Sequence, residues 1–168
     1  AARRTGPARV IYASSSSVYG NAVSYPTHEE LLPRPLSPYG VTKLAAEHLC
    51  GLYAETYAVP TVSLRYFTVY GPRQRPDMAM HRLVASAIDG IEFPLFGDGE
   101  QIRDFTFVDD VVAANLAAAE ADVAPGFVCN VAGGGAATMN EVVAIVEEAA
   151  GTPVKVVRAP EQPGDVRR

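Results

Sequence analysis

Segments with the residue pattern of β-strands alternate with helical segments along the whole of this chain. The apolar run 10–13 and the alternating residues 61–66 predict strands. Residues 38–57 carry alanines and leucines at helical spacing, after a Ser37 N-cap and a first-turn proline. Because strands that alternate with helices form a largely parallel sheet, we predict an α/β fold. Further strands are expected at 93–96, 102–107, 127–131 and 154–157, and further helices at 77–89, 109–121 (capped by Asp109) and 139–150 (with a Thr138–Glu141 capping box).

The composition is that of a globular protein of about one domain, with 168 residues, of which 48% are hydrophobic and 20% charged. A net charge of −5 gives no electrostatic reason to expect a nucleic-acid partner. We expect no membrane partner, because no apolar run approaches the roughly 20 residues of a membrane span. Cys50 and Cys129 stand far apart without metal-ligand spacing, so we predict no metal site and a cytoplasmic, reducing location.

Tyr39 and Lys43 give the strongest chemical signal in the sequence. Residues four apart on a helix share a face, so the tyrosine hydroxyl and the lysine ammonium can point into one site. A free tyrosine is a poor base at neutral pH, and a fixed cation beside it favours the phenolate. A surface tyrosine beside a solvated lysine has the same spacing, so the pair alone leaves the function open.

A run of four serines, Ser14 to Ser17, directly follows the predicted strand 10–13. In open parallel sheets, ligands bind beyond the carboxyl ends of strands, where a hydroxyl can position a reacting oxygen. A polar turn is the alternative interpretation. Strand-end serines followed 24 residues later by Tyr-x-x-x-Lys, counted from Ser15, are far more specific than either part alone.

A resemblance to a known family rests on four motifs in this order: SSSSVYG, SPYGVTK, LRYFTVYGPRQRPDMA and FGDGEQIRDFTFVDDVV. They resemble the extended short-chain dehydrogenase/reductase superfamily, and within it the NAD-dependent nucleotide-sugar epimerases and dehydratases, closest to UDP-glucuronate 4-epimerases and UDP-glucose 4-epimerases. The resemblance implies that NAD is the cofactor and that Ser15, Tyr39 and Lys43 are catalytic. In this assignment Tyr39 is the base, and Lys43 tunes it and binds the nicotinamide ribose. Ser14 joins Tyr39 and Lys43 at the cofactor site.

The resemblance also implies a Rossmann-like parallel sheet whose N-terminal, cofactor-binding half is missing. Family members usually begin with a strand and a G-x-x-G-x-x-G loop that holds the cofactor pyrophosphate, and nothing before Val10 supplies one. We interpret Gly133-Gly134-Gly135 as a structural turn. Residues 1–68 are expected to form the second half of the NAD-binding domain. Residues 69–168 are expected to form a smaller α/β substrate-binding region, with about 102–121 returning to the first domain. The sequence is thus expected to be about half of a longer enzyme and inactive alone.

The serine run discriminates among the reactions of this family. Dehydratases carry an acidic Asp-Glu pair where this chain has Ser16 and Ser17, and the related decarboxylases usually have Glu at the second position. A serine cannot supply the carboxylic acid that water elimination needs. The favoured reaction is 4-epimerisation, in which Tyr39 removes a sugar hydroxyl proton, hydride passes from C4 to NAD, and the hydride returns to the other face of the 4-keto sugar. A dehydratase or a reductase stays as an alternative.

Thr68 and Arg75 bear on the identity of the sugar. Many UDP-glucose 4-epimerases have Asn at the position of Thr68, whereas the run TVYGPRQRPDMA is more similar to UDP-glucuronate 4-epimerases. Their equivalents of Thr68 and Arg75 lie near the sugar carboxylate, which an arginine fork suits. Arg75 is equally well interpreted as a solvent-facing charge on a proline-flanked loop. UDP-glucuronate is favoured, with UDP-glucose or a UDP-N-acetylhexosamine as alternatives.

The resemblance assigns the nucleotide end of the substrate to the second half of the chain. Arg103 matches the family arginine that contacts the diphosphate, and Met80 and His81 begin a helix similar to the diphosphate-binding helix. Phe96 belongs to a segment that packs along the base, and Asp165 borders the nucleotide. The predicted substrate-binding residues are Ser15, Ser16, Ser17, Thr68, Arg75, Met80, His81, Phe96, Arg103 and Asp165.

A non-catalytic protein of the same fold, which binds a UDP-sugar as a sensor or scaffold, is the alternative outside the enzymes. The intact set of Ser15, Tyr39 and Lys43 favours the enzyme. Relatives commonly dimerise through two helices, one of which carries the Tyr-Lys pair, so a homodimer is expected by analogy.

Overall fold

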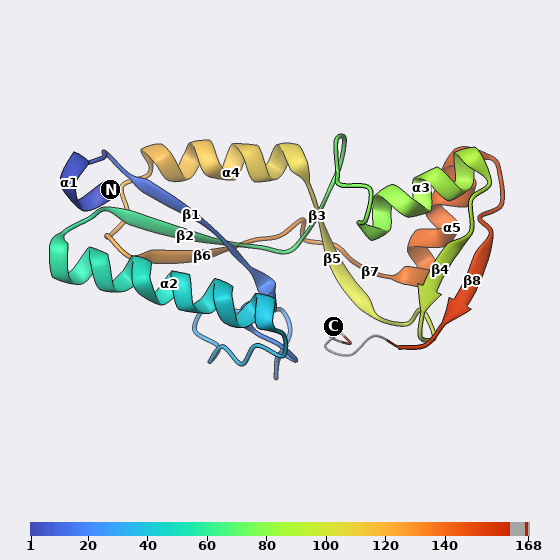
Figure 1. Cartoon of the computed structure of the whole chain (residues 1–168), viewed down its shortest axis with the longest axis horizontal. Coiled ribbons are helices and arrows are strands. Elements are labelled where there is room, and N and C mark those ends of the chain that lie inside the picture. Colours follow the sequence, from blue (N-terminus) through green and yellow to red (C-terminus); the bar gives the residue numbers. More distant parts are fainter. Residues whose placement is uncertain (162–166, 168) are drawn as a thin grey trace.

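The first of two layered parts is a parallel sheet covered by helices on both faces. The computed structural model describes residues 1–161 and 167. Strands β1 (Val10–Ser15), β2 (Thr61–Tyr66) and β6 (Phe127–Val131) pair in parallel in the order β1-β2-β6. Helices α2 (Pro38–Tyr57) and α4 (Val108–Glu120) lie on opposite sides of this sheet (Figure 1). The predicted α/β fold with a parallel sheet is confirmed.

The second part has its own apolar core. Strand β4 (Phe93–Phe96) pairs in parallel with β8 (Val156–Ala159), and helices α3 (Ala79–Asp89) and α5 (Met139–Ala150) pack beside them (Figure 1). The buried side chains of this core come from α3, β4 and α5 and from Val154 just before β8; they are Leu83, Ala87, Phe93, Leu95, Met139, Val142, Val143 and Val154. A separate cluster in the first part contains Val62, Leu64 and Ala118.

Strand β5 (Ile102–Phe107) runs between the two parts (Figure 1). Its first three residues pair with β7 (Ala136–Thr138) in the antiparallel sense, and its last three pair with β3 (Thr68–Tyr70) in parallel. Helix α4, which follows β5 directly, packs on β1 and β2. The predicted domain division stays a prediction. The pairing of β6 with β2 brings a further late segment, beyond 102–121, to the first sheet.

Local capping residues explain where the helices begin. The Ser37 side chain accepts a hydrogen bond of 3.1 Å from the Gly40 N–H at the start of α2. At α5, Thr138 and Glu141 make both bonds of the predicted capping box. The predicted cap at Asp109 is wrong: α4 begins one residue earlier, with Phe107 as N-cap, and Asp109 lies in the first turn, where its charge favours the helix dipole.

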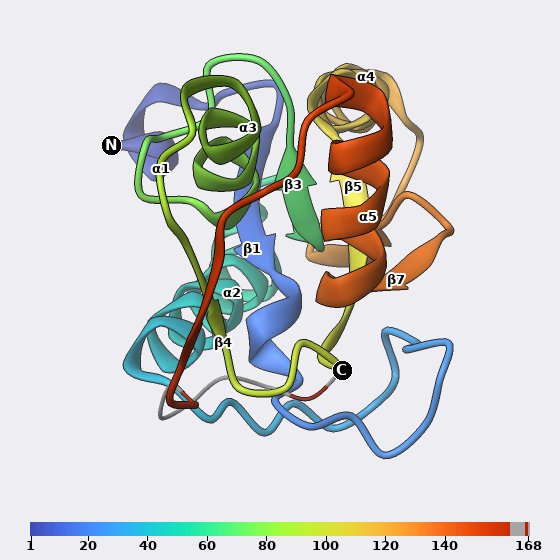
Figure 2. The same cartoon turned by 90° about the vertical axis from the view of Figure 1, so that its right-hand side faces the viewer.

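Several short elements were not predicted, because three or four residues carry too little periodicity to be recognised. Among the predicted elements, β1 extends through the second serine, α3 begins at Ala79, and β8 begins two residues later than expected. The unpredicted elements are α1 (Ala2–Thr5), the 3-10 helix η1 (Ser16–Val18), β3 and β7. The chain between η1 and α2 forms a long loop below β1 in Figure 2.

Within the described residues, none of the helices is both long enough and apolar enough to cross a membrane. Across the same residues, no group of three His, Cys, Asp or Glu side chains is placed to hold a metal ion. Cys50 and Cys129 are unpaired and half-buried, and burial raises the pKa of both thiols.

Candidate active site

Helix α2 presents Tyr39 and Lys43 at the carboxyl end of β1. The Lys43 Nζ lies 5.5 Å from the centroid of the Tyr39 ring and 5.5 Å from that of Tyr12. It donates a 3.0 Å hydrogen bond to the Ala13 carbonyl, which ties the ammonium to the end of the strand. An ammonium has three N–H donors, so this bond leaves donors for a ligand. The Tyr39 side chain is 55% exposed and accessible to one.

The first two serines of the run have different environments. The Ser15 hydroxyl accepts a 3.2 Å hydrogen bond from Ser17 N, capping η1, and donates at 3.1 Å to the Ser17 hydroxyl. Ser14 is 2% exposed, and its hydroxyl donates at 2.8 Å to Glu47 Oε2. The Ser14 hydroxyl is therefore bound to Glu47 of the same chain, and its contact with a cofactor stays a prediction.

Gly40 lets the first turn of α2 lie against the serine run. A Cβ atom on this glycine would stand 2.5 Å from the Ser17 carbonyl oxygen and 2.9 Å from the Cβ of Pro35. Contacts under about 3 Å are closer than packed carbon atoms allow. Because glycine occupies this position, the helix turn that carries Tyr39 sits beside the turn that carries Ser15 and Ser17.

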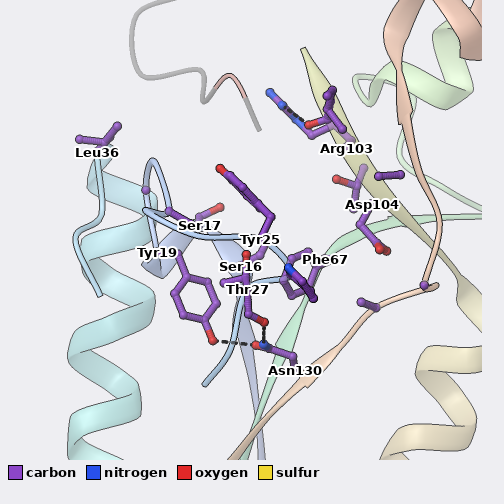
Figure 3. Close-up of a pocket in the computed structure, with 18 of the residues that line it drawn as sticks. Ser16, Ser17, Tyr19, Tyr25, Thr27, Leu36, Phe67, Arg103, Asp104 and Asn130 are labelled. Atoms are coloured by element: carbon purple, nitrogen blue, oxygen red, sulfur yellow. Dashed lines mark hydrogen bonds between the residues drawn. The ribbon is translucent and has the colours of Figure 1, made fainter. Parts of the chain in front are cut away.

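A cavity of about 610 Å³, which we call the serine cavity, lies between the serine run and β5 (Figure 3). Four predicted substrate residues line it: Ser16, Ser17, Thr68 and Arg103. Among the residues that the structure describes, Asp104 is the carboxylate that lines it, and it accepts a 2.8 Å hydrogen bond from Gly133 N. Ser15, Tyr39 and Lys43 are not among the lining residues, although Ser37 at the start of α2 is. Other side chains that line it, Tyr19, Tyr25, Thr27, Leu36, Phe67 and Asn130, were not predicted as site residues.

A second cavity of about 440 Å³, the α3 cavity, lies along the start of α3 and β4. The predicted substrate residues Met80 and Phe96 line it. Thr68 and Arg103 line both this cavity and the serine cavity. The Arg103 guanidinium donates to the Ile102 carbonyl at 2.8 Å. The structure thus brings six of the predicted substrate residues to two adjoining cavities that share Thr68 and Arg103 in their linings.

Arg75 and His81, two further predicted substrate residues, line neither of these cavities. Arg75 is an exposed side chain that forks onto the Asp77 carboxylate, with Nε–Oδ1 at 3.1 Å and Nη2–Oδ2 at 3.0 Å, and it lines neither cavity. His81 lines a third cavity, of about 480 Å³, together with Tyr70. Asp165 lies outside the described residues.

Sequence reasoning missed a buried ion pair beneath the site. Glu47 and Arg65 are 6% and 4% exposed, and they form a two-pronged salt bridge. Burial lowers the pKa of Arg65, but its hydrogen bonds with Glu47 and Tyr19 outweigh this and raise the pKa above its ordinary value. The signal that could have found the pair is Glu47 itself, a carboxylate one turn beyond Lys43 on the same face of the helix.

Similarity to known proteins agrees with this arrangement. Residues 1–132 match the NAD dependent epimerase/dehydratase family. An uncharacterized UDP-glucose epimerase, YtcB of Bacillus subtilis (strain 168), is 44% identical over 141 residues, which cover 84% of this chain and 44% of YtcB. The chain spans about half the length of the curated relatives it matches.

Two solved structures are similar over nearly the whole chain. The UDP-glucuronic acid 4-epimerase of Bacillus cereus, in complex with UDP-glucuronic acid and NAD, has a TM-score of 0.90 and 44% identity over 95% of this chain and 51% of that one. MoeE5, in complex with UDP-glucuronic acid and NAD, has a TM-score of 0.95 and 45% identity over 99% and 56%. With its parallel sheet, its Tyr-x-x-x-Lys helix and these relatives, the chain belongs to the NAD dependent epimerase/dehydratase family.

Proposed function

We propose that the complete protein is an NAD-dependent UDP-sugar 4-epimerase, with UDP-glucuronate as the favoured substrate and Tyr39 as the base. The observation that carries this proposal is the position of Tyr39 and Lys43 at the end of β1, next to the Ser15 turn and the serine cavity. Relatives that are named as 4-epimerases of UDP-glucuronic acid support it.

Each residue has a distinct part in the proposed reaction. Tyr39 takes the proton from the sugar O4, and the nearby Lys43 cation stabilises the phenolate. The Ser15 hydroxyl exchanges its hydrogen bond to Ser17 for one to the same sugar oxygen, which it orients. The chemistry supplied by bound NAD is to accept the C4 hydride and return it to the other face of the 4-keto sugar. Tyr39 and Lys43 suit the nicotinamide end of that cofactor, because the ammonium keeps free donors beside an exposed phenol.

The lining of the serine cavity favours epimerisation over dehydration. Elimination of water needs a carboxylic acid near the leaving hydroxyl, and Ser16 and Ser17 supply hydroxyls there. Asp104, the carboxylate that does line the cavity, stands on β5 and already accepts the Gly133 N–H. The keto intermediate is then left to rotate and take back its hydride at C4 and its proton from Tyr39 at O4.

UDP-glucose is the second candidate substrate, and one observation favours it. Arg75, the residue assigned to the sugar carboxylate, is bound to Asp77 on the surface. Recognition of a glucuronate by this arginine therefore requires that ion pair to open. MoeE5, one of the similar structures, is described both with UDP-glucuronic acid and with UDP-glucose.

The test is to incubate the complete protein with NAD and, separately, with UDP-glucuronate and UDP-glucose, and to resolve the epimers by NMR. Conversion of the uronate alone supports the assignment of Thr68 and Arg75. Conversion of UDP-glucose alone keeps the mechanism and discards the carboxylate assignment. Conversion of neither overturns the proposed activity and leaves a binding protein of the same fold.

A cytoplasmic homodimer is part of the same proposal. Helix α2 exposes Val41, Leu49 and Leu52, which are 52%, 55% and 51% accessible. Exposed apolar side chains gathered on one helix are typical of an interface. The oligomeric state of the complete protein in solution, measured by light scattering, tests this point.

A further inference from the structure

A buried network of charged and polar side chains begins at α2. Arg65 Nε donates to Glu47 Oε2 at 3.0 Å, its Nη2 donates to Oε1, and Ser14 adds a hydrogen bond of 2.8 Å to Oε2. Taking two charges out of water is costly, and well-packed apolar residues often match a buried ion pair in stability. Because stability alone does not require this pair, its directional hydrogen bonds point to a role in positioning.

The third nitrogen of Arg65 leads the network away from α2. Nη1 donates to the Tyr19 hydroxyl at 2.7 Å and to the Glu29 carbonyl at 3.1 Å. Tyr19 in turn donates to Asn130 Oδ1 at 2.8 Å. Asn130 donates from Nδ2 to the Thr27 carbonyl at 2.9 Å and from its backbone N–H to the Glu29 carboxylate at 2.7 Å. Figure 3 shows this end, with Tyr19, Asn130 and Thr27 joined in a row.

The protonation of Tyr19 fits this direction of hydrogen bonding. Its hydroxyl accepts from Arg65 and donates to Asn130, so it must keep its proton. Burial raises the pKa of Tyr19 and outweighs the hydrogen bond from Arg65, which lowers it. The phenol therefore stays neutral and serves as a fixed link at ordinary pH.

Both ends of the network reach the candidate site. Tyr19, Thr27 and Asn130 line the serine cavity. At the other end, Glu47 stands four residues beyond Lys43 and eight beyond Tyr39, on the same face of α2. Ser14 precedes the catalytic serine position in β1. The network thus spans from the helix that carries Tyr39 and Lys43 to the part of the cavity wall that Tyr19, Thr27 and Asn130 form.

We propose that Glu47, Arg65, Tyr19 and Asn130 form a positioning network that fixes the wall of the serine cavity relative to Tyr39 and Lys43. None of the four is assigned to the reacting atoms, and they act through the serine turn and the loop residues 27–29. The kinetic part of this inference rests on the proposed function. Cutting the network on the cavity side should weaken substrate binding, whereas cutting it on the α2 side should also slow the chemical step.

The least disruptive cut is Tyr19→Phe, which removes one hydroxyl and keeps the ring. Tyr66→Phe is the matched control, because it removes a tyrosine–asparagine hydrogen bond of 3.0 Å, to Asn115, and neither residue lines the serine cavity. In the complete protein with NAD and UDP-glucuronate or UDP-glucose, we expect Tyr19→Phe to raise KM about tenfold with kcat within about twofold. Tyr66→Phe should leave both constants unchanged. Arg65→Lys should lower kcat and raise KM, because an ammonium cannot reproduce the fork.

Hydrogen exchange supplies a readout that does not depend on turnover. Amides of residues 17–20 and 27–31 should exchange faster in Tyr19→Phe than in Tyr66→Phe, at equal melting temperature. If the unmodified complete protein converts no UDP-sugar, the proposed function fails and the exchange comparison still decides on the network. A Tyr19→Phe protein whose KM and exchange rates match those of Tyr66→Phe overturns the inference.

Discussion

Tyr39 is the single side chain on which the proposed chemistry depends most. Replacing it by phenylalanine removes the proposed base and keeps the ring that lies near Lys43. We expect Tyr39→Phe to lower turnover by about 10²–10⁴-fold. UDP binding, measured by calorimetry on the same protein, should persist.

The control for this substitution is Tyr53→Phe, at an exposed tyrosine farther along the same helix whose ring lies tilted beside that of Tyr57. It should keep full activity. Retained turnover in Tyr39→Phe would contradict the proposed mechanism.

Gly40 provides a second test at a single position. An added methyl group would meet the Ser17 carbonyl, which is main chain and cannot move without shifting the serine turn. We expect Gly40→Ala to cost about 1–3 kcal/mol of unfolding free energy and to reduce turnover. Chemical denaturation and an activity assay measure the two effects.

Gly51 offers the matched control on the same helix, because nothing lies within 4 Å of a Cβ built there. Gly51→Ala should stabilise the protein by about 0.5–1 kcal/mol, since alanine favours helix. Equal stability of the two alanine variants would show that the close approach at Gly40 is unimportant.

At the scale of residues, the sequence predicted the placement of side chains that local spacing determines. It did not predict side chains that are brought together by long-range contacts. Helical spacing predicts that Tyr39 and Lys43 share a face of α2, and their assignment to catalysis rests on the resemblance of the four ordered motifs. Asn130 and Thr27 are 103 residues apart and meet only through the fold, so no local pattern announces them. Arg75 was predicted to lie near the sugar carboxylate, but a local contact holds it elsewhere. Asp77, two residues farther along the chain, binds its guanidinium on the surface.

At the scale of elements, capping chemistry was predictable where a side chain supplies it. The box at α5 is confirmed, whereas α4 starts without any side-chain cap and its start was therefore placed wrongly. Strands β3 and β7 owe their existence to pairing with β5. Such strands depend on a distant partner and not on their own three residues.

The capping box makes α5 sensitive to acid. Hydrogen bonds from the Thr138 backbone N–H and hydroxyl hold the pKa of Glu141 below its ordinary value. A carboxyl with a depressed folded pKa stabilises the fold above its unfolded pKa, and this contribution is lost as the pH falls through the folded value. We expect the melting-temperature difference between wild type and Glu141→Gln to shrink between about pH 6 and about pH 3.

Glu148→Gln is the control for acidification, because this carboxylate on the same helix lies outside the capping box. A wild-type advantage over Glu141→Gln that stays constant with pH would mean that the charge of Glu141 contributes nothing at the helix terminus.

At the scale of the whole molecule, two separate apolar cores imply two regions that open with some independence. Leu83 is fully buried in the second core. We expect Leu83→Ala to cost about 2–5 kcal/mol. Hydrogen exchange should quicken more in α3 and α5 than in β1 and β2.

Leu116→Ala, at a side chain that is 65% exposed on α4, should change the unfolding free energy by less than about 0.5 kcal/mol. Equal acceleration of exchange in both parts of Leu83→Ala would indicate one cooperative unit.

The pairing of distant segments in the first sheet was harder to predict from the sequence than the fold class. Alternating segments predicted the parallel sheet, but the order β1-β2-β6 places a segment near residue 130 beside one near residue 64. The pairing of β6 with β2 depends on the burial of β2. The first five residues of β2 are all buried between its two neighbouring strands. Burial on both sides is a property of the assembled chain.

Strand β5 pairs with two different strands, and this double pairing limits changes in its own length. Its residues Ile102 to Asp104 are matched to one partner strand and Phe105 to Phe107 to another. Side chains alternate along a strand, so one inserted or deleted residue within β5 would turn one of the two halves inside out. Arg103 and Phe105 would then face opposite ways from each other. Changes in the length of this strand are therefore expected only in steps of two residues.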